Sequence, residues 1–164
     1  LKKWKKIIKN DKFNIGINWH SNPLSNVVGR SISINHFFKL SELQNVRLYS
    51  LQKFDGSKQT MINKNLNIIS FKEDLDKNET FFDTCGIMMN LDLIITIDTS
   101  IAHLAGSLGK KVWLVLNDVP EWRWQLDINY SHWYPSMTIF RCKKKDDWKS
   151  IFIDIDKELK NILK

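Results

Sequence analysis

The sequence predicts an α/β fold built on a parallel β-sheet. Short apolar segments rich in β-branched residues alternate along the chain with segments whose apolar residues recur at helical spacing. The clearest strand, Leu93 to Ile97, is apolar at almost every position, as strands buried on both faces of a parallel sheet are. Alternating strands and helices indicate βαβ units with right-handed crossovers and helices on both faces of the sheet. For about six strands the leading topology is the Rossmann-like, doubly wound order 3-2-1-4-5-6.

The N-terminal half of the chain supplies three of these strands. It begins with an apolar stripe among lysines, formed by Leu1, Trp4, Ile7 and Ile8. The stripe is short, and it suits a connector helix that packs on a preceding domain better than a helix on a membrane surface. Residues 13–19 alternate and end in a polar turn at His20, which is typical of a strand. A polar loop to Arg30, a helix over 32–43, a strand over 46–51, a weak helix and a strand over 66–71 follow.

The C-terminal half continues the alternation. Residues 79–91 carry apolar residues at helical spacing, with Asn78 as a candidate N-cap. After the strand over 93–97, the segment Ile101–Leu108 has helical periodicity, and Gly109 ends it as a C-terminal cap would. The remaining expected elements are a strand over 111–116, an aromatic loop over 117–135, a strand over 137–141 and a helix over 151–163.

Length and composition predict one globular domain over residues 13–164, preceded by a connector helix over residues 1–12. The chain has 164 residues, of which 43% are hydrophobic and 26% charged, and we find no segment as long as a membrane span. The Lys-rich start lacks the apolar segment of a signal peptide. Cys85 and Cys142 lie far apart and outside any CxxC spacing, which favours a reducing compartment, so we expect a cytoplasmic protein. Because the first residue is Leu1, we expect a portion of a longer chain.

The net charge of +7 lies at the two ends of the chain. Residues 1–12 contribute six Lys and one Asp, a balance of +5, and residues 143–164 contribute seven Lys and five acids, a balance of +2. The body between them has twelve basic and twelve acidic residues. A nucleic-acid groove requires a basic body, so we expect no nucleic-acid partner.

Several common catalytic motifs are missing from the sequence. The first strand runs into Trp19-His20-Ser21-Asn22-Pro23 without the glycines of a GxGxxG motif, which argues against a dinucleotide-dependent dehydrogenase. Neither a GxxxxGK[ST] loop nor a GxSxG elbow is present. The four histidines do not have metal-ligand spacing, so we expect no metal and no cofactor.

The tripeptide Asp98-Thr99-Ser100 lies where a buried strand passes into a helix, and His103 lies one turn later. Such a turn points free backbone N–H groups and hydroxyls beyond the carboxyl end of the strand, where they suit a phosphate. In the expected strand order the first and fourth strands are neighbours, and a ligand crevice opens where both end. The alternatives are an ordinary helix N-cap and a partly buried histidine bonded to a neighbour.

The residues around this turn carry a resemblance. The run from Phe82 to Gly106 resembles bacterial glycosyltransferase domains related to heptosyltransferases, which are often fused behind tetratricopeptide repeats. The likeness covers nearly the whole chain from Ile15 onward and extends to Trp19-x-x-Asn22-Pro23, Arg30-Ser31, Ser50-Leu51-Gln52-Lys53, Trp122-Arg123-Trp124 and Trp133-Tyr134-Pro135-Ser136-Met137.

The resemblance implies the C-terminal, donor-binding half of a GT-B glycosyltransferase. In that family the Asp-Thr-x-x-x-His segment binds the diphosphate of a nucleotide sugar, which assigns Thr99, Ser100 and His103 to the diphosphate. Asp98 would orient the turn or meet the sugar. Some relatives have Gly where this chain has Ser100. We expect Thr99→Val or His103→Ala to affect turnover more than folding.

The same resemblance implies an enzyme that needs no metal and takes its catalytic base from an N-terminal half. The fragment is therefore expected to bind donor and not to turn over alone, with an upstream domain as partner and an unknown acceptor. The alternatives are a non-catalytic module that binds a nucleotide or nucleotide sugar, and a Rossmann-like interaction domain.

Looser assignments concern side chains near the expected strand ends. Arg30 and Lys53 are candidates for neutralising phosphate, or are solvated surface charges. Phe82 and Thr84 open a helix near the expected nucleobase, although Phe82 could be plain core. For Trp122 and Trp124, ordinary packing competes with a wall for the sugar or a partner domain. The candidates for nucleobase or sugar contacts are Trp19, Asn22, Phe82, Thr84, Arg123 and Trp124.

Overall fold

A computed structural model of the chain describes residues 2–21, 29–53, 66–71, 75–77 and 80–164. Within these residues six parallel strands form one sheet in the order β3-β2-β1-β4-β5-β6. The strands are β1 (Phe13–Asn18), β2 (Val46–Ser50), β3 (Ile68–Ser70), β4 (Leu93–Ile97), β5 (Val112–Leu116) and β6 (Met137–Arg141). The predicted α/β class and its doubly wound order are confirmed.

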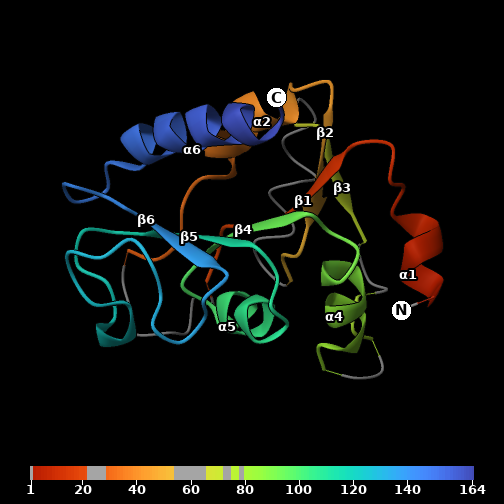
Figure 1. Ribbon diagram of the computed structural model, residues 1–164, viewed down its shortest axis with the longest axis horizontal. Helices are drawn as coiled ribbons and strands as arrows, with labels where there is room; N and C mark the ends of the chain where they lie inside the picture. The colour runs from red at the N-terminus through yellow and green to blue at the C-terminus, as the bar shows by residue number, and fades with distance from the viewer. Residues whose placement is uncertain (1, 22–28, 54–65, 72–74, 78–79) are drawn as a thin grey trace.

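Helices cover both faces of the sheet (Figure 1). The 3₁₀ turn η1 (Ile34–Phe37), the short helix α2 (Phe38–Ser41) and the long helix α6 (Trp148–Ile162) pack on one face, where they share a buried cluster with Ile15, Ile95 and Trp113. On the other face α1 (Lys2–Ile7), α4 (Phe82–Met88) and α5 (Ser100–Ser107) enclose a second cluster around Ile94 and Leu114. Because both faces are covered, β4 and β5 are buried along their whole length, which explains their continuous apolar sequence.

Three helices differ from their predicted bounds. The helix predicted over 32–43 is instead η1 followed by the single turn α2, and the hydroxyl of Ser33 accepts from the Asn35 N–H at the start. Helix α4 begins at Phe82 because Phe81, its N-cap, adopts a left-handed backbone with φ of 65°. The predicted cap, Asn78, lies outside the described residues. Helix α6 begins earlier than predicted, after Asp147, whose carboxylate accepts from the Ser150 N–H.

The N-terminal helix belongs to this domain's own core. Trp4 and Ile8 are almost fully buried, and the Trp4 indole N–H donates to Asp83 Oδ1 at 2.9 Å. Gly86 makes room for the indole, since a Cβ there would lie 2.5 Å from Trp4 Cδ1. Trp4 and Ile8 therefore pack within this domain, whereas Ile7 is 46% exposed; packing of the stripe on a preceding domain stays a prediction.

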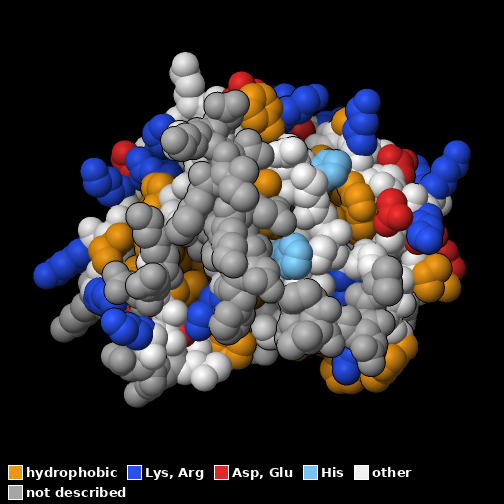
Figure 2. Space-filling model, turned by 180° about the vertical axis from the view of Figure 1, so that it is seen from behind, with side chains coloured by type: hydrophobic (Ala, Val, Ile, Leu, Met, Phe, Trp, Pro, Cys, Tyr) orange, Lys and Arg blue, Asp and Glu red, His pale blue; other side chains and the backbone are white. Residues whose placement is uncertain are grey.

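On one face of the molecule the charges of the described residues are dispersed. On the face seen in Figure 2 the described Lys and Arg side chains lie scattered around the rim, with acidic side chains among them. Among the described residues, no helix combines the length and the apolar character that crossing a membrane requires.

Candidate functional site

The carboxyl ends of β1 and β4 are neighbours and are tied together by side chains. Strand β1 pairs with β4 in parallel, with Asn18 opposite Thr96. The Thr99 hydroxyl, just beyond β4, donates to Asn18 Oδ1 at 2.8 Å. Asn18 is buried, so its amide needs partners. The loop after β1 and the turn after β4, which the sequence assigned to one crevice, are therefore joined by a hydrogen bond where they begin.

Gln52 organises the same edge of the sheet from the end of β2. Its Oε1 accepts from Asn18 Nδ2 at 2.9 Å and from the His20 backbone N–H at 2.9 Å. Its Nε2 donates to the carbonyl oxygens of His20 and Lys53, each at 3.0 Å. Sequence reasoning did not single out Asn18 or Gln52, although a polar residue at the end of a buried strand is a signal that a buried partner exists.

Helix α5 begins at this edge with an open N-terminus. Thr99 is the N-cap, and its side chain makes no capping bond because the hydroxyl is directed to Asn18. Ser100, the first helical residue, is exposed. Within the described part of the chain no acceptor is found for the backbone N–H groups of Ser100 and Ile101. Uncapped N–H groups at the positive end of a helix dipole favour an anion.

Arg30 lies across Asp98 at this edge. Its Nη2 is 3.2 Å from Asp98 Oδ2, and both side chains are largely buried, with exposed fractions of 25% and 10%. Burial raises the pKa of Glu121, but hydrogen bonds with the backbone and side chain of Arg123 outweigh it, so the pKa lies below its ordinary value. The charge of Arg30 makes a smaller contribution in the same direction. Arg30, Asp98, Glu121 and Asn117 line a cavity of about 50 Å³. The guanidinium is thus paired with the carboxylate of Asp98, which directly precedes the N-cap of α5.

His103 lies on α5, one turn after Ser100. It contacts two aromatic side chains, Trp124 and Tyr134, and the sequence did not predict these contacts. Its Nδ1 is 3.0 Å from the Tyr134 hydroxyl. Its ring stacks on Trp124, with centroids 5.1 Å apart and planes 26° apart. The loop after β5 therefore fixes the imidazole, and Nε2 has no partner among the described residues.

Lys53 and Thr84 belong to a second network, around Asp76. The Asp76 carboxylate accepts from the Thr84 hydroxyl at 2.5 Å and from the Thr84 N–H at 2.9 Å, and it lies 3.4 Å from Lys53 Nζ. Asp76 thus caps the start of α4, and the Thr84 groups that a ligand would use are already taken. Phe82 is 66% exposed, so it is not a core residue.

The aromatic candidates divide by burial. Trp19 and Trp124 are 0% and 1% exposed, so neither ring has a surface that a nucleobase or sugar could contact; burial corrects both assignments. Arg123 forms an ion pair with Glu121 at 2.6 Å and lies over the exposed Trp122 ring. Asn22 lies outside the described residues.

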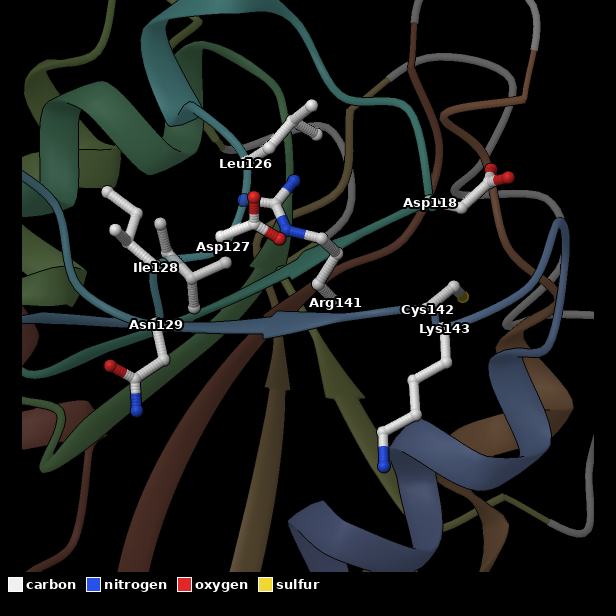
Figure 3. Close-up of a pocket in the computed structure, with 9 residues that line it drawn as sticks. Asp118, Leu126, Asp127, Ile128, Asn129, Arg141, Cys142 and Lys143 are labelled. Carbon is white, nitrogen blue, oxygen red and sulfur yellow. The ribbon is translucent and has the colours of Figure 1, made fainter.

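A larger hollow, of about 590 Å³, lies beside β6 and not at the crevice (Figure 3). Asp118, Asp127, Arg141 and Lys143 all line it, so its charges balance. The Arg141 guanidinium lies within it and donates to the Trp124 carbonyl at 3.0 Å, and burial lowers the pKa of Arg141.

Nothing in the described residues gathers three or more His, Cys, Asp or Glu side chains into a group that could hold a metal ion. The sequence matches no protein-family model, and no curated protein with which it was compared matches it.

Proposed function

We propose that this chain is the donor-binding half of a glycosyltransferase of the GT-B type, which binds the diphosphate of a nucleotide sugar at the start of α5. The observation that carries the proposal is the N-terminus of α5 at the β1–β4 switch point, where Ser100 is exposed and no described residue caps the first N–H groups. A switch point is where doubly wound sheets bind their ligands, and a helix N-terminus is where they bind phosphate.

Two side chains support an anion there. Arg30 brings a guanidinium to the edge of the site through its contact with Asp98, and His103 brings an imidazole with an unpartnered Nε2 among the described residues. Fixed donors and a cation stabilise a departing diphosphate as negative charge builds on it. In glycosyl transfer the bond from the sugar to the diphosphate breaks, the acceptor oxygen or nitrogen bonds to the sugar, and the acceptor's proton passes to a base.

The sharpest test removes one backbone donor and leaves the side chains of Arg30, Thr99 and His103 in place. Ser100→Pro deletes the first helical N–H at a position where helices accept proline, and the extended backbone of Thr99 (φ −143°, ψ 175°) suits a residue before proline. Ser100→Ala is the matched control, because it keeps the N–H. Calorimetric titration with UDP, ADP, GDP and inorganic pyrophosphate should give a Kd at least about tenfold weaker for Ser100→Pro than for Ser100→Ala.

Two results would overturn the proposal. One is wild-type protein that binds none of the four compounds in the millimolar range. The other is equal binding by Ser100→Pro and Ser100→Ala. His103→Gln should also weaken binding, whereas His132→Gln, at an exposed position, should not.

A non-catalytic module that binds a nucleotide or nucleotide sugar is the second candidate. The ion pair between Asp98 and Arg30 favours it, because it occupies a carboxylate at the turn before α5 that could otherwise meet an acceptor. Donor hydrolysis or transfer by the polypeptide that includes the upstream residues separates the two: turnover lost in Ser100→Pro supports the enzyme, and binding without turnover supports the module.

A further inference from the structure

The contact between Tyr134 and His103 joins the loop after β5 to the first turns of α5. Tyr134 Oη lies 3.0 Å from His103 Nδ1, and the two rings meet edge to face with centroids 5.8 Å apart. The two residues are 31 positions apart in the sequence. The imidazole is therefore oriented by a side chain from another element and not by its own helix.

The Tyr134 ring is fixed in turn by a glycine on α5. A Cβ at Gly106 would lie 2.4 Å from Tyr134 Cγ, so the phenol ring packs directly on the helix backbone. Gly106 and His103 are three residues apart and hence on the same helix face. This close approach places the phenol hydroxyl beside the imidazole.

Trp124 also packs against the imidazole. The Trp124 indole is buried and stacks on the His103 ring. The backbone carbonyl of Trp124 accepts a hydrogen bond from Arg141 Nη2 on β6. Figure 3 shows Arg141 reaching from β6 toward the loop that follows Trp124. His103 is thus enclosed by two aromatic side chains that are each fixed by the sheet or by α5.

The hydrogen-bond chemistry of this pair selects one tautomer. A neutral imidazole has one N–H donor and one acceptor nitrogen. The phenol hydroxyl has no other partner among the described residues, and by donating to Nδ1 it satisfies its own proton and the imidazole lone pair together. The imidazole proton then stays on Nε2. The reverse arrangement would turn a bare lone pair toward any anion at Nε2.

We propose that Tyr134 is a positioning residue of the anion site, which keeps His103 as the Nε2–H tautomer with its ring fixed so that it donates to a diphosphate. The tautomer assignment rests on the Tyr134 contact, and the role toward diphosphate rests on the proposed function. Tyr134 acts only through His103.

The first measurement is the ¹⁵N spectrum of histidine-labelled protein at a pH where imidazole is neutral, with His103→Gln to assign the signals. Wild type should show His103 protonated at Nε2, with Nδ1 accepting a hydrogen bond. Tyr134→Phe, which keeps the ring on Gly106, should shift the Nδ1 signal to that of a nitrogen without this bond. The matched control is Tyr130→Phe, which removes an exposed phenol hydroxyl from the same loop. A proton on Nδ1 in wild type, or an Nδ1 signal unchanged in Tyr134→Phe, would overturn the assignment.

The second measurement is binding of inorganic pyrophosphate and UDP. Tyr134→Phe should weaken both by about three- to tenfold, the size of one lost hydrogen bond, and Tyr130→Phe should not. Unchanged binding in Tyr134→Phe, with the ¹⁵N shift present, would overturn the positioning role and leave the site intact. Failure of wild type to bind either compound would instead overturn the proposed function, while the ¹⁵N result still decides the tautomer.

Discussion

Thr99 Oγ1 and Asn18 Oδ1 lie 2.8 Å apart, and their hydrogen bond joins the turn after β4 to the last residue of β1. Asn18 is 3% exposed, so solvent cannot easily replace a lost donor. The Thr99 hydroxyl therefore has a structural role. The expectation that Thr99→Val affects turnover more than folding stays a prediction, which the unfolding measurement below and an activity assay together test.

Thr99→Val should lower the free energy of unfolding by about 1–3 kcal/mol, because it removes the shorter of two hydroxyl contacts to the buried Asn18 Oδ1 and leaves only the Thr96 hydroxyl, at 3.3 Å. Thr99→Ser keeps the hydroxyl and should stay within about 1 kcal/mol of wild type. Urea unfolding measures both. Equal stability of the valine and serine variants would contradict a structural role for the hydroxyl.

Gln52→Ala should be more destabilising than most single polar substitutions. It removes the acceptor of Asn18 Nδ2 and the His20 N–H, and the donor to two carbonyl oxygens. We expect a loss of about 2–3 kcal/mol in urea unfolding. Gln44→Ala, at an exposed position, is the control and should change stability by less than about 0.5 kcal/mol.

The fold could be predicted because it follows from burial. Strands β4 and β5 are apolar throughout since helices cover both sides of the sheet, and that pattern is local in the sequence. The start of α4 could not be predicted, because a bulky residue such as Phe81 rarely adopts a positive φ.

Part of the candidate site could likewise be predicted from local sequence, and part could not. The turn at Thr99 and Ser100 could be found from a strand followed by a helix. Its partners Asn18 and Tyr134 could not, because they lie 81 residues from Thr99 and 31 residues from His103, respectively. Only the packing of separate elements brings such residues together, and spacing within one segment carries no sign of it.

Cys142 should react far more slowly than Cys85 with a thiol reagent. Burial, with a smaller contribution from nearby carboxylates such as Asp147, raises the pKa of Cys142 to about 11. At pH 8 that leaves roughly 0.1% thiolate, the reactive form. Burial also raises the pKa of Cys85, but its side chain is only partly buried.

Alkylation rates of Cys85→Ser and Cys142→Ser, each with one thiol, measure the difference, and we expect at least about tenfold faster reaction at Cys85. The two rates should converge in urea. Fast reaction of Cys142 in the folded protein would contradict its burial.

Protonation of Asp11 should contribute to the loss of folding stability at low pH. Its hydrogen bonds with Arg47, at 2.6 and 3.1 Å, lower the pKa of the Asp11 carboxyl from 3.8 to about 2. A depressed folded-state pKa stabilises the fold above pH 3.8, and this contribution is lost as the pH falls through about 2. Arg47→Lys keeps the charge but loses the paired geometry, so the Asp11 pKa should rise toward 3.8 in a ¹³C carboxyl titration. Arg123→Lys, at the pair with Glu121, should leave the Asp11 titration unchanged.

Gly106→Ala sets two effects of opposite sign against each other. Alanine favours a helix interior over glycine by about 1 kcal/mol. Its Cβ, however, would lie 2.4 Å from Tyr134 Cγ and 2.7 Å from Cδ1, and overpacking costs about 1–3 kcal/mol. We expect the clash to win, with a lower unfolding free energy and a displaced Tyr134 ring. Ser107→Ala, at the exposed neighbouring position, gains propensity without the clash and should not destabilise.

A double-mutant cycle isolates the clash, because Tyr134→Ala removes the ring that Gly106→Ala would meet. In the Tyr134→Ala background Gly106→Ala should become neutral or stabilising, since only the propensity gain remains. The ¹⁵N signal of His103 Nδ1 should shift in Gly106→Ala as it does in Tyr134→Phe, because the displaced phenol no longer reaches the imidazole. A destabilisation of equal size in both backgrounds would show that the cost of Gly106→Ala does not come from Tyr134.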